Sequence, residues 1–191
     1  MNTFGFLTFL EDPRHGFFGG YLVLSARGRP LEFRCSTPVL PTRAQQILYG
    51  TTLRPYVLAE VLGQALVASA QSPVRAILTD AAEMLELALL RSEEVLWVHA
   101  VSSGEGASRA GVESSAASAA ILPRGAAAGD RGVRLAPFSS LKPEEVVPLL
   151  GELAQHVDLL EPFERIRTAL REAGQIPEPA SPDDSAHDAA A

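Results

Sequence analysis

Short apolar runs separated by turn residues dominate the N-terminal part of the chain. Three of them, residues 4–10, 21–26 and 31–37, are rich in aromatic and aliphatic side chains and have the length of β-strands. Residues 27–30, Arg-Gly-Arg-Pro, carry the glycine and proline typical of a tight turn. We therefore predict three strands, of which the second and third form a hairpin. Because side chains alternate between the two faces of a strand, we expect one face of the first strand to carry Phe4, Phe6, Thr8 and Leu10.

A helical pattern follows the three predicted strands. Thr42 is a possible cap of a short helix that ends at Gly50. Pro55 suits a first helical turn, and residues 56–70 repeat apolar side chains at helical spacing. We expect this main helix to bury a broad stripe made of Val57, Val61, Leu62, Ala65, Leu66 and Ala68.

Two further apolar runs predict buried strands. Residues 74–79 form a short run of the type found inside parallel sheets, and residues 95–101 form a second one. Between them, residues 81–91 have the pattern of a helix. Asp80 stands between the first strand and this helix, at the carboxyl end of the strand.

The composition changes after residue 101. Residues 102–137 are rich in Gly, Ala and Ser, which is typical of a flexible insertion or linker, with a short structured piece at 119–124. Residues 138–173 regain apolar residues at helical spacing and predict a helical element that packs on the first domain, broken into two helices at Pro162. Residues 174–191 are expected to form a disordered acidic tail. The α/β domain itself is assigned to residues 1–101.

Charge narrows the range of partners. The net charge is −7, and residues 142–191 alone hold eleven acidic against four basic residues. Proteins that bind nucleic acid usually show a basic stripe, so a nucleic-acid partner is not expected, whereas a protein partner or self-association is. Fifteen of the sixteen basic residues are arginine, which is typical of a GC-rich bacterial genome.

The remaining composition argues for a cytoplasmic protein. No apolar run is long enough to span a membrane, and the N-terminus lacks the pattern of a secretory signal. Cys35 is the only cysteine, so neither an intramolecular disulfide nor a cysteine-based zinc site is expected. We expect Cys35 to be a buried strand residue and His99 to be a core or edge histidine rather than a catalytic base.

The order of predicted elements resembles the ribonuclease H-like superfamily, whose mixed sheet begins with a three-stranded antiparallel meander. Residues 19–33, GGYLVLSARGRPLEF, are similar to the second and third strands of ribonuclease H. Residues 58–70 and 74–80 are similar to its helix and fourth strand, and VLWVHA (95–100) to its fifth. The resemblance covers residues 4–101 and implies an α/β fold with a ribonuclease H-like mixed sheet, followed here by C-terminal helices.

The same resemblance implies a possible metal site. Catalytic members hold two divalent metal ions with several carboxylates. Glu60 matches the helix carboxylate and Asp80 the carboxylate at the end of the fourth strand. The acid expected inside the first strand is missing from FGFLTFL, and only Glu11 or Asp12 at the strand's end could replace it. Mg²⁺ or Mn²⁺ would be the cofactor of such a site.

Each of these carboxylates also has a simpler interpretation. Asp80 could be the N-cap of the following helix. Glu60, with Gln64 one turn on, could be part of a solvent-facing polar stripe. Glu11 and Asp12 could belong to a plain turn.

We therefore expect a non-catalytic protein-binding or structural protein on a degenerate ribonuclease H-like fold, without a cofactor. The alternative is a divalent-metal-dependent nuclease that acts on a phosphodiester through Glu60, Asp80 and either Glu11 or Asp12.

Overall fold

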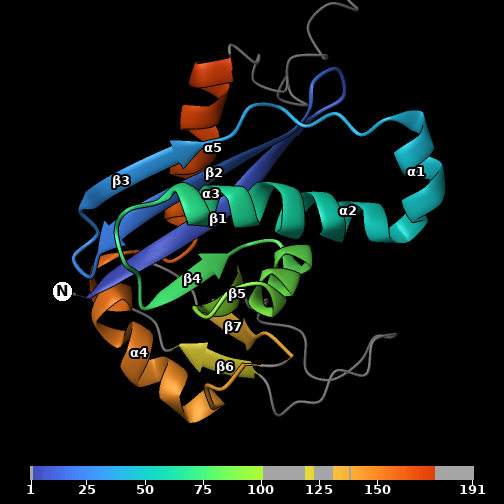
Figure 1. Ribbon diagram of the computed structural model, residues 1–191. Coiled ribbons are helices and arrows are strands. Elements are labelled where there is room, and N and C mark those ends of the chain that lie inside the picture. Colours follow the sequence, from blue (N-terminus) through green and yellow to red (C-terminus); the bar gives the residue numbers. More distant parts are fainter. Residues whose placement is uncertain (1, 101–118, 123–130, 138, 175–191) are drawn as a thin grey trace, which may run out of the picture.

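Seven strands form one mixed sheet in the computed structural model, which describes residues 2–100, 119–122, 131–137 and 139–174 (Figure 1). Their order across the sheet is β3-β2-β1-β4-β5-β7-β6. The strands span β1 Thr3–Asp12, β2 Gly16–Ser25, β3 Pro30–Cys35, β4 Ala76–Thr79, β5 Glu94–Ala100, β6 Ala119–Leu122 and β7 Arg131–Leu135.

The strand directions confirm the predicted fold class. β1, β2 and β3 are antiparallel neighbours, and β4 and β5 run parallel to β1. This is the strand order and direction of a ribonuclease H-like sheet, with β7 and β6 added antiparallel beyond β5. The turn between β1 and β2 is shorter than the sequence suggested, because β2 already begins at Gly16 rather than at Tyr21.

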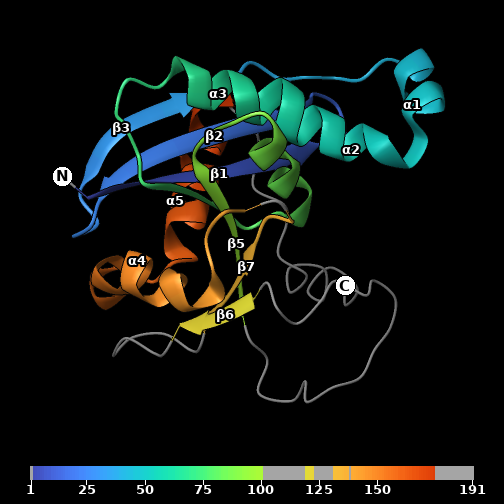
Figure 2. The ribbon, with the colours of Figure 1, turned by 60° about the horizontal axis from the view of Figure 1, so that its bottom comes forward.

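Helices cover both faces of the sheet, which gives three layers (Figure 2). α4 and α5 pack on one face, and a continuous helical segment from Leu53 to Ser69 packs on the other, together with η3. In the described part of the chain, no helix combines the length and the apolar character needed to cross a membrane. The helices span α1 Arg43–Tyr49, η1 Gly50–Thr52, α2 Leu53–Pro55, η2 Tyr56–Gly63, α3 Gln64–Ser69, η3 Ala82–Leu89, α4 Pro143–His156 and α5 Glu161–Gly174.

Two adjacent glycines in β2 let the helical layers approach the sheet closely. A Cβ at Gly19 would lie 2.7 Å from Leu66 on α3, and a Cβ at Gly20 would lie 2.3 Å from Ile166 on α5. Successive strand residues face opposite sides, so each glycine admits one helix. The Gly-Gly pair is therefore a packing device that brings α3 and α5 onto β2.

The main helix buries a different stripe from the one predicted. Val57, Leu62 and Leu66 are buried as expected, but Ala65 and Ala68 are exposed. The cause is local geometry, because η2 is a π-helix, whose i→i+5 hydrogen bonds change the angular spacing of side chains relative to an α-helix. The core is completed instead by residues that the α-helical spacing missed, namely Leu58, Ala59, Gly63 and Val67.

Two strands lie within the range 102–137, for which composition predicted a linker. β7 pairs with β5 along its length, and β6, at the expected structured piece, pairs with β7. Val133 and Leu135 of β7 are buried in the same core as β5. The sheet therefore continues beyond the boundary predicted at residue 101, and the rest of the predicted linker, apart from residues 136 and 137, lies outside the described residues.

The C-terminal region forms two helices, as the proline at position 162 predicted. α4 ends at His156, and α5 begins at Glu161 with Pro162 buried in its first turn. The predicted disordered tail lies outside the described residues, apart from Gly174 at the end of α5.

Candidate functional site

A small polar network surrounds Asp80 at the carboxyl end of β4. The Thr8 hydroxyl donates to Asp80 Oδ1 at 2.7 Å, and Arg167 Nη2 donates to Oδ2 of the same carboxylate. Arg167 also donates to Thr8 Oγ1 at 3.1 Å and, through Nη1, to Glu164 at 2.6 Å. The side chains of Asp80 and Arg167 are 15% and 22% exposed, and Thr8 is fully buried. The Thr8 hydroxyl and the Arg167 guanidinium thus hold the Asp80 carboxylate in a largely solvent-excluded position.

The sheet register explains why Thr8 meets Asp80. Leu7 of β1 pairs with Thr79 of the parallel strand β4, so the next residues of the two strands are also neighbours. Thr8 is on the α5 face of β1, the face predicted from the alternation of Phe4 and Phe6. A buried hydroxyl at this point needs a polar partner, and the Asp80 carboxylate provides it.

Helix spacing explains why Arg167 reaches the same place. Arg167 follows the buried Phe163 by four residues and precedes the buried Leu170 by three, so it lies on the apolar stripe of α5. A cation on a buried stripe requires an anionic partner, and Asp80 is that partner. The ion pair therefore fastens the C-terminal helix to the edge of the central strands.

The predicted N-cap role of Asp80 is wrong. The N-cap of η3 is Ala81, and no side chain caps that helix. The Ala81 N–H bonds instead to Thr79 Oγ1 at 3.2 Å, and the predicted helix is a 3₁₀-helix over Ala82–Leu89. The Asp80 carboxylate is consequently free to point toward α5.

Glu11 and Asp12 lie too far along β1 to join Asp80. β1 continues past the last residue of β4, and three residues of strand beyond Thr8 cover about 10 Å. Glu11 bonds instead to Arg54 Nη1 at 2.6 Å. Asp12 closes the β1–β2 turn, where it accepts the backbone N–H groups of residues 14 and 15. The N–H of Arg14 above all holds the pKa of the Asp12 carboxyl below its ordinary value.

Glu60 lies on the opposite side of the sheet from Arg167. It belongs to η2, which covers the face away from α5, and its side chain is exposed. The structure therefore does not bring Glu60 together with Asp80. Its position agrees with the solvent-facing polar stripe that we gave as the simpler interpretation.

The donor set at the end of β4 does not fit a metal site. Within the residues that the structure describes, no three His, Cys, Asp or Glu side chains are grouped so that they could hold a metal ion. The carboxylate of Asp80 already faces a guanidinium, whose positive charge opposes a divalent cation at the same oxygens.

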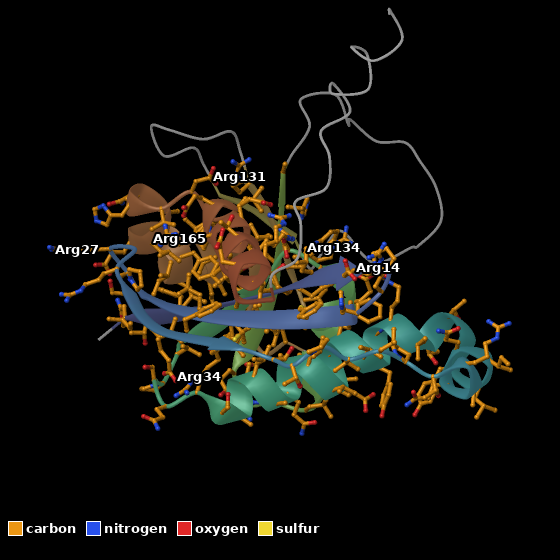
Figure 3. All side chains as sticks on the ribbon, turned by 90° about the horizontal axis from the view of Figure 1, so that it is seen from above. Arg14, Arg27, Arg34, Arg131, Arg134 and Arg165 are labelled. Carbon is orange, nitrogen blue, oxygen red and sulfur yellow. The ribbon has the colours of Figure 1, made fainter. Side chains whose placement is uncertain are left out.

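Two other acidic side chains of the C-terminal region, Asp158 between α4 and α5 and Glu161 on α5, also pair with arginines. Asp158 accepts two hydrogen bonds from Arg131, at 2.9 and 2.7 Å, which lower the pKa of the Asp158 carboxyl. Glu161 pairs with Arg165 one turn along α5, at 2.6 Å. Figure 3 shows Arg131 and Arg165 on the α4–α5 side of the sheet. Arginine is therefore the counter-ion of Asp80, Asp158, Glu161 and Glu164 on this face.

A polar pocket of about 280 Å³ opens on the other face, beside Tyr21 and the end of α3. Its charged lining residues, Arg91 and Glu93, pair with each other at 2.7 Å, and the bond lowers the pKa of Glu93. Burial raises the pKa of the Tyr21 phenol, which keeps it neutral. The pocket thus presents a neutralised pair and a neutral phenol, a weak basis for binding a charged ligand.

His99 does not carry the features of a catalytic base. Its ring lies 4.6 Å from that of Trp97 on the same strand, and burial lowers the pKa of the imidazole. The expectation of an edge or core histidine agrees with this position. Cys35, by contrast, is exposed rather than buried, because β3 is the edge strand of the sheet.

The α1 arm (residues 40–49) is the most exposed apolar feature of the described chain. No residue of the helix α1 is buried, and Figure 1 shows α1 projecting from the end of the α2–α3 helix away from the sheet. Ile47 is 66% and Leu48 is 82% exposed. The helix is held by a capping box between Thr42 and Gln45 and by the stacking of Tyr49 on a neighbouring tyrosine. Its apolar side chains are thus not needed for the core of this fold.

Comparison with known proteins adds little to this description. No protein-family model matches the chain, and no curated protein matches it. Among solved structures, the chain is similar to Argonaute of Marinitoga piezophila in complex with a 5′-OH guide RNA. The similarity has a TM-score of 0.41 and 10% sequence identity, and it covers 87% of this chain and 29% of the Argonaute chain.

The class of protein therefore rests on the structure itself. The chain is an α/β protein with a ribonuclease H-like mixed sheet, and at the end of β4 it carries an arginine-neutralised aspartate.

Proposed function

We propose that this protein is a non-catalytic protein-binding module on a degenerate ribonuclease H-like fold. The observation that carries the proposal is the contact between Asp80 and Arg167. Arg167 of α5 forms an ion pair with the carboxylate that a metal-dependent member would use to bind its metal ions. In this protein the carboxylate therefore holds α5 against the sheet. The site then stabilises the fold and does no chemistry.

The nuclease alternative has less support from the same residues. Of its four candidate carboxylates, Asp80 and Glu11 face arginines, Asp12 closes a turn, and Glu60 lies on the other face of the sheet. Two-metal catalysis needs carboxylates that converge on shared ions. These side chains do not converge.

The α1 arm supports the binding half of the proposal. Isolated helices as short as α1 are only marginally stable in water, so a surface helix usually gains its stability by packing an apolar face. Here Leu40, Ile47 and Leu48 are exposed by 62%, 66% and 82%. Neighbouring exposed apolar side chains such as Ile47 and Leu48 are typical of protein–protein contact sites. We propose that the partner is another protein with an apolar groove that accepts this arm.

Site-specific photo-crosslinking tests the α1 arm. A photoreactive amino acid at Leu48 in the full chain should capture one protein reproducibly in the host cells. The purified partner should then bind the Leu48→Asp variant much more weakly than the unchanged protein. The matched control is Leu89→Asp, a leucine that is 61% exposed on η3 and should bind normally. Both substitutions are at the surface and should change stability by about 0.5 kcal/mol or less. Equal binding by the two variants would contradict the role of the arm.

A metal titration followed by thermal melting tests the proposal that the protein is not a metal-dependent enzyme. Mg²⁺ and Mn²⁺ should leave the melting temperature unchanged, because a ligand stabilises only a folded state that binds it. The control is Asp80→Asn, compared with and without metal. A rise of several degrees that disappears in Asp80→Asn would overturn the proposal and favour the nuclease.

A further inference from the structure

β3 is an edge strand of the sheet that the structure describes. Among the strands that the structure describes, β3 pairs only with β2, and it ends the sheet opposite to β6. A register shift in the β2–β3 ladder lies between Val23 and Leu24, toward the start of β3. The stretch from Glu32 to Cys35 beyond it keeps a regular ladder. Such an edge offers unpaired backbone groups to another strand.

The ladder shows which backbone groups point outward. The Ser36 N–H bonds to the Gly19 carbonyl at 3.0 Å, and hydrogen-bonded pairs alternate along an antiparallel ladder. Arg34 and Glu32 therefore direct their backbone groups toward β2. Phe33 and Cys35 direct theirs away from it, to the open edge.

The side chains of β3 divide by face. Phe33, 39% exposed, pairs with Leu22 and lies on the α5 face together with the exposed Cys35. Glu32 and Arg34 lie on the α3 face and pair with each other at 2.8 Å. Figure 3 shows Arg34 on that side of the sheet, away from Arg131 and Arg165. The edge is thus apolar on one face and charged on the other.

The sequence of this edge is complementary to itself. In an antiparallel pair of two β3 strands centred on Phe33, Glu32 of each copy would oppose Arg34 of the other. The two Phe33 residues would form a hydrogen-bonded pair with their rings on the same face. Opposite charges and aromatic pairs across strands both favour pairing. We propose that β3 joins β3 of a second copy of this chain in this register, which makes one continuous sheet of two molecules.

Glu32 and Arg34 both stay charged over the physiological pH range. Backbone N–H groups, that of Gln71 first, lower the pKa of the Glu32 carboxyl to about 2. Glu32 accepts N–H groups from Gln71 and Ser72 at 2.8 to 3.1 Å, so it is already positioned before any pairing. Arg34 is 39% exposed and can share its guanidinium with a second carboxylate. This surface lies apart from the α1 arm, so the inference stands independently of the proposed function.

Sedimentation or light scattering of the full chain over a concentration series tests the pairing. The unchanged protein should reach twice the mass of the 20.3 kDa chain. Phe33→Lys places two like charges directly opposite each other and should weaken the dimer roughly tenfold or more. The control is Leu89→Lys, which should dimerise as the unchanged protein does. Circular dichroism should show that both variants are folded.

The single native cysteine gives a second measurement without mutation. In the proposed register, Cys35 of one copy opposes Leu31 of the other, so the two cysteines are offset by four residues, about 14 Å along the strands. A spin label on Cys35 should therefore show dipolar broadening that disappears when labelled protein is diluted with unlabelled protein. Arg34→Glu should reduce the broadening, because the new glutamate at position 34 of each copy would lie opposite Glu32 of the other copy and repel it.

Three results would overturn the proposal. The protein could remain a monomer at every concentration, or its dimer could survive Phe33→Lys, which would place the contact elsewhere. A dimer lost in Leu48→Asp but kept in Phe33→Lys would assign self-association to the α1 arm. Loss of partner capture at Leu48 with an intact β3 dimer would instead count against the proposed function alone.

Discussion

Replacing Arg167 by alanine is expected to destabilise the protein by about 3 kcal/mol, measured by denaturant unfolding. Removal of one member of a buried ion pair costs about 3 to 5 kcal/mol, because the other charge stays buried without a partner. Asp80 and Arg167 are 15% and 22% exposed, so water partly screens the loss and the lower end applies. The carboxylate keeps only the Thr8 hydroxyl in the variant.

Arg165→Ala is the matched control for this substitution. Arg165 lies two residues away on α5 and pairs with Glu161, but both side chains are about half exposed, at 41% and 50%. Such a surface pair within a helix contributes about 0.3 to 0.5 kcal/mol. The double variant Asp80→Asn with Arg167→Ala should lose less stability than Arg167→Ala alone, since no unpaired charge remains. If Arg167→Ala and Arg165→Ala cost the same, the network at Asp80 does not hold α5.

Gly20→Ala is expected to cost about 2 to 3 kcal/mol. The new methyl group would lie 2.3 Å from Ile166 and 3.2 Å from Leu170, so α5 or β2 would have to shift. Overpacking of a dense core typically costs about 1 to 3 kcal/mol, and here two layers are already in contact. Chemical denaturation measures the loss, and hydrogen exchange should show faster exchange in α5.

The control for this glycine is Gly151→Ala in α4. A Cβ at Gly151 meets no atom within 4 Å, and the residue is inside a helix. Alanine is favoured over glycine there by about 0.5 to 1 kcal/mol, so this variant should be stabilised. The two substitutions add the same methyl group and should act with opposite sign. Equal effects would mean that the Gly20 contact with α5 is not tight.

Much of the fold could be predicted from local pattern. The strands β1 to β5 were found because apolar alternation and turn residues mark them directly, and their order matched a known sheet. β7 was missed because its five residues, Arg131–Leu135, contain two arginines and a glycine and sit in a Gly/Ala-rich region. Its strand character comes from pairing with β5, a partner distant in sequence.

The site was harder to predict, because its residues come from three distant parts of the chain. The position of Asp80 at the end of a strand could be predicted, but its partners Thr8 and Arg167 are 72 and 87 residues away. A signal for Arg167 was present, since it interrupts an apolar stripe between Phe163 and Leu170. Such an interruption predicts a buried cation, although it cannot name the anion.

The length of this connection also bears on how the protein is made. Thr8 and Arg167 are separated by 159 residues, and α5 covers β1 and β2. Contacts between distant residues form slowly, because the closure of a long loop costs entropy before the contact repays it. During synthesis, the apolar face of the first hairpin therefore stays open to solvent until α5 has left the ribosome. Apolar surface exposed in this way during synthesis is the kind of surface that chaperones protect from aggregation.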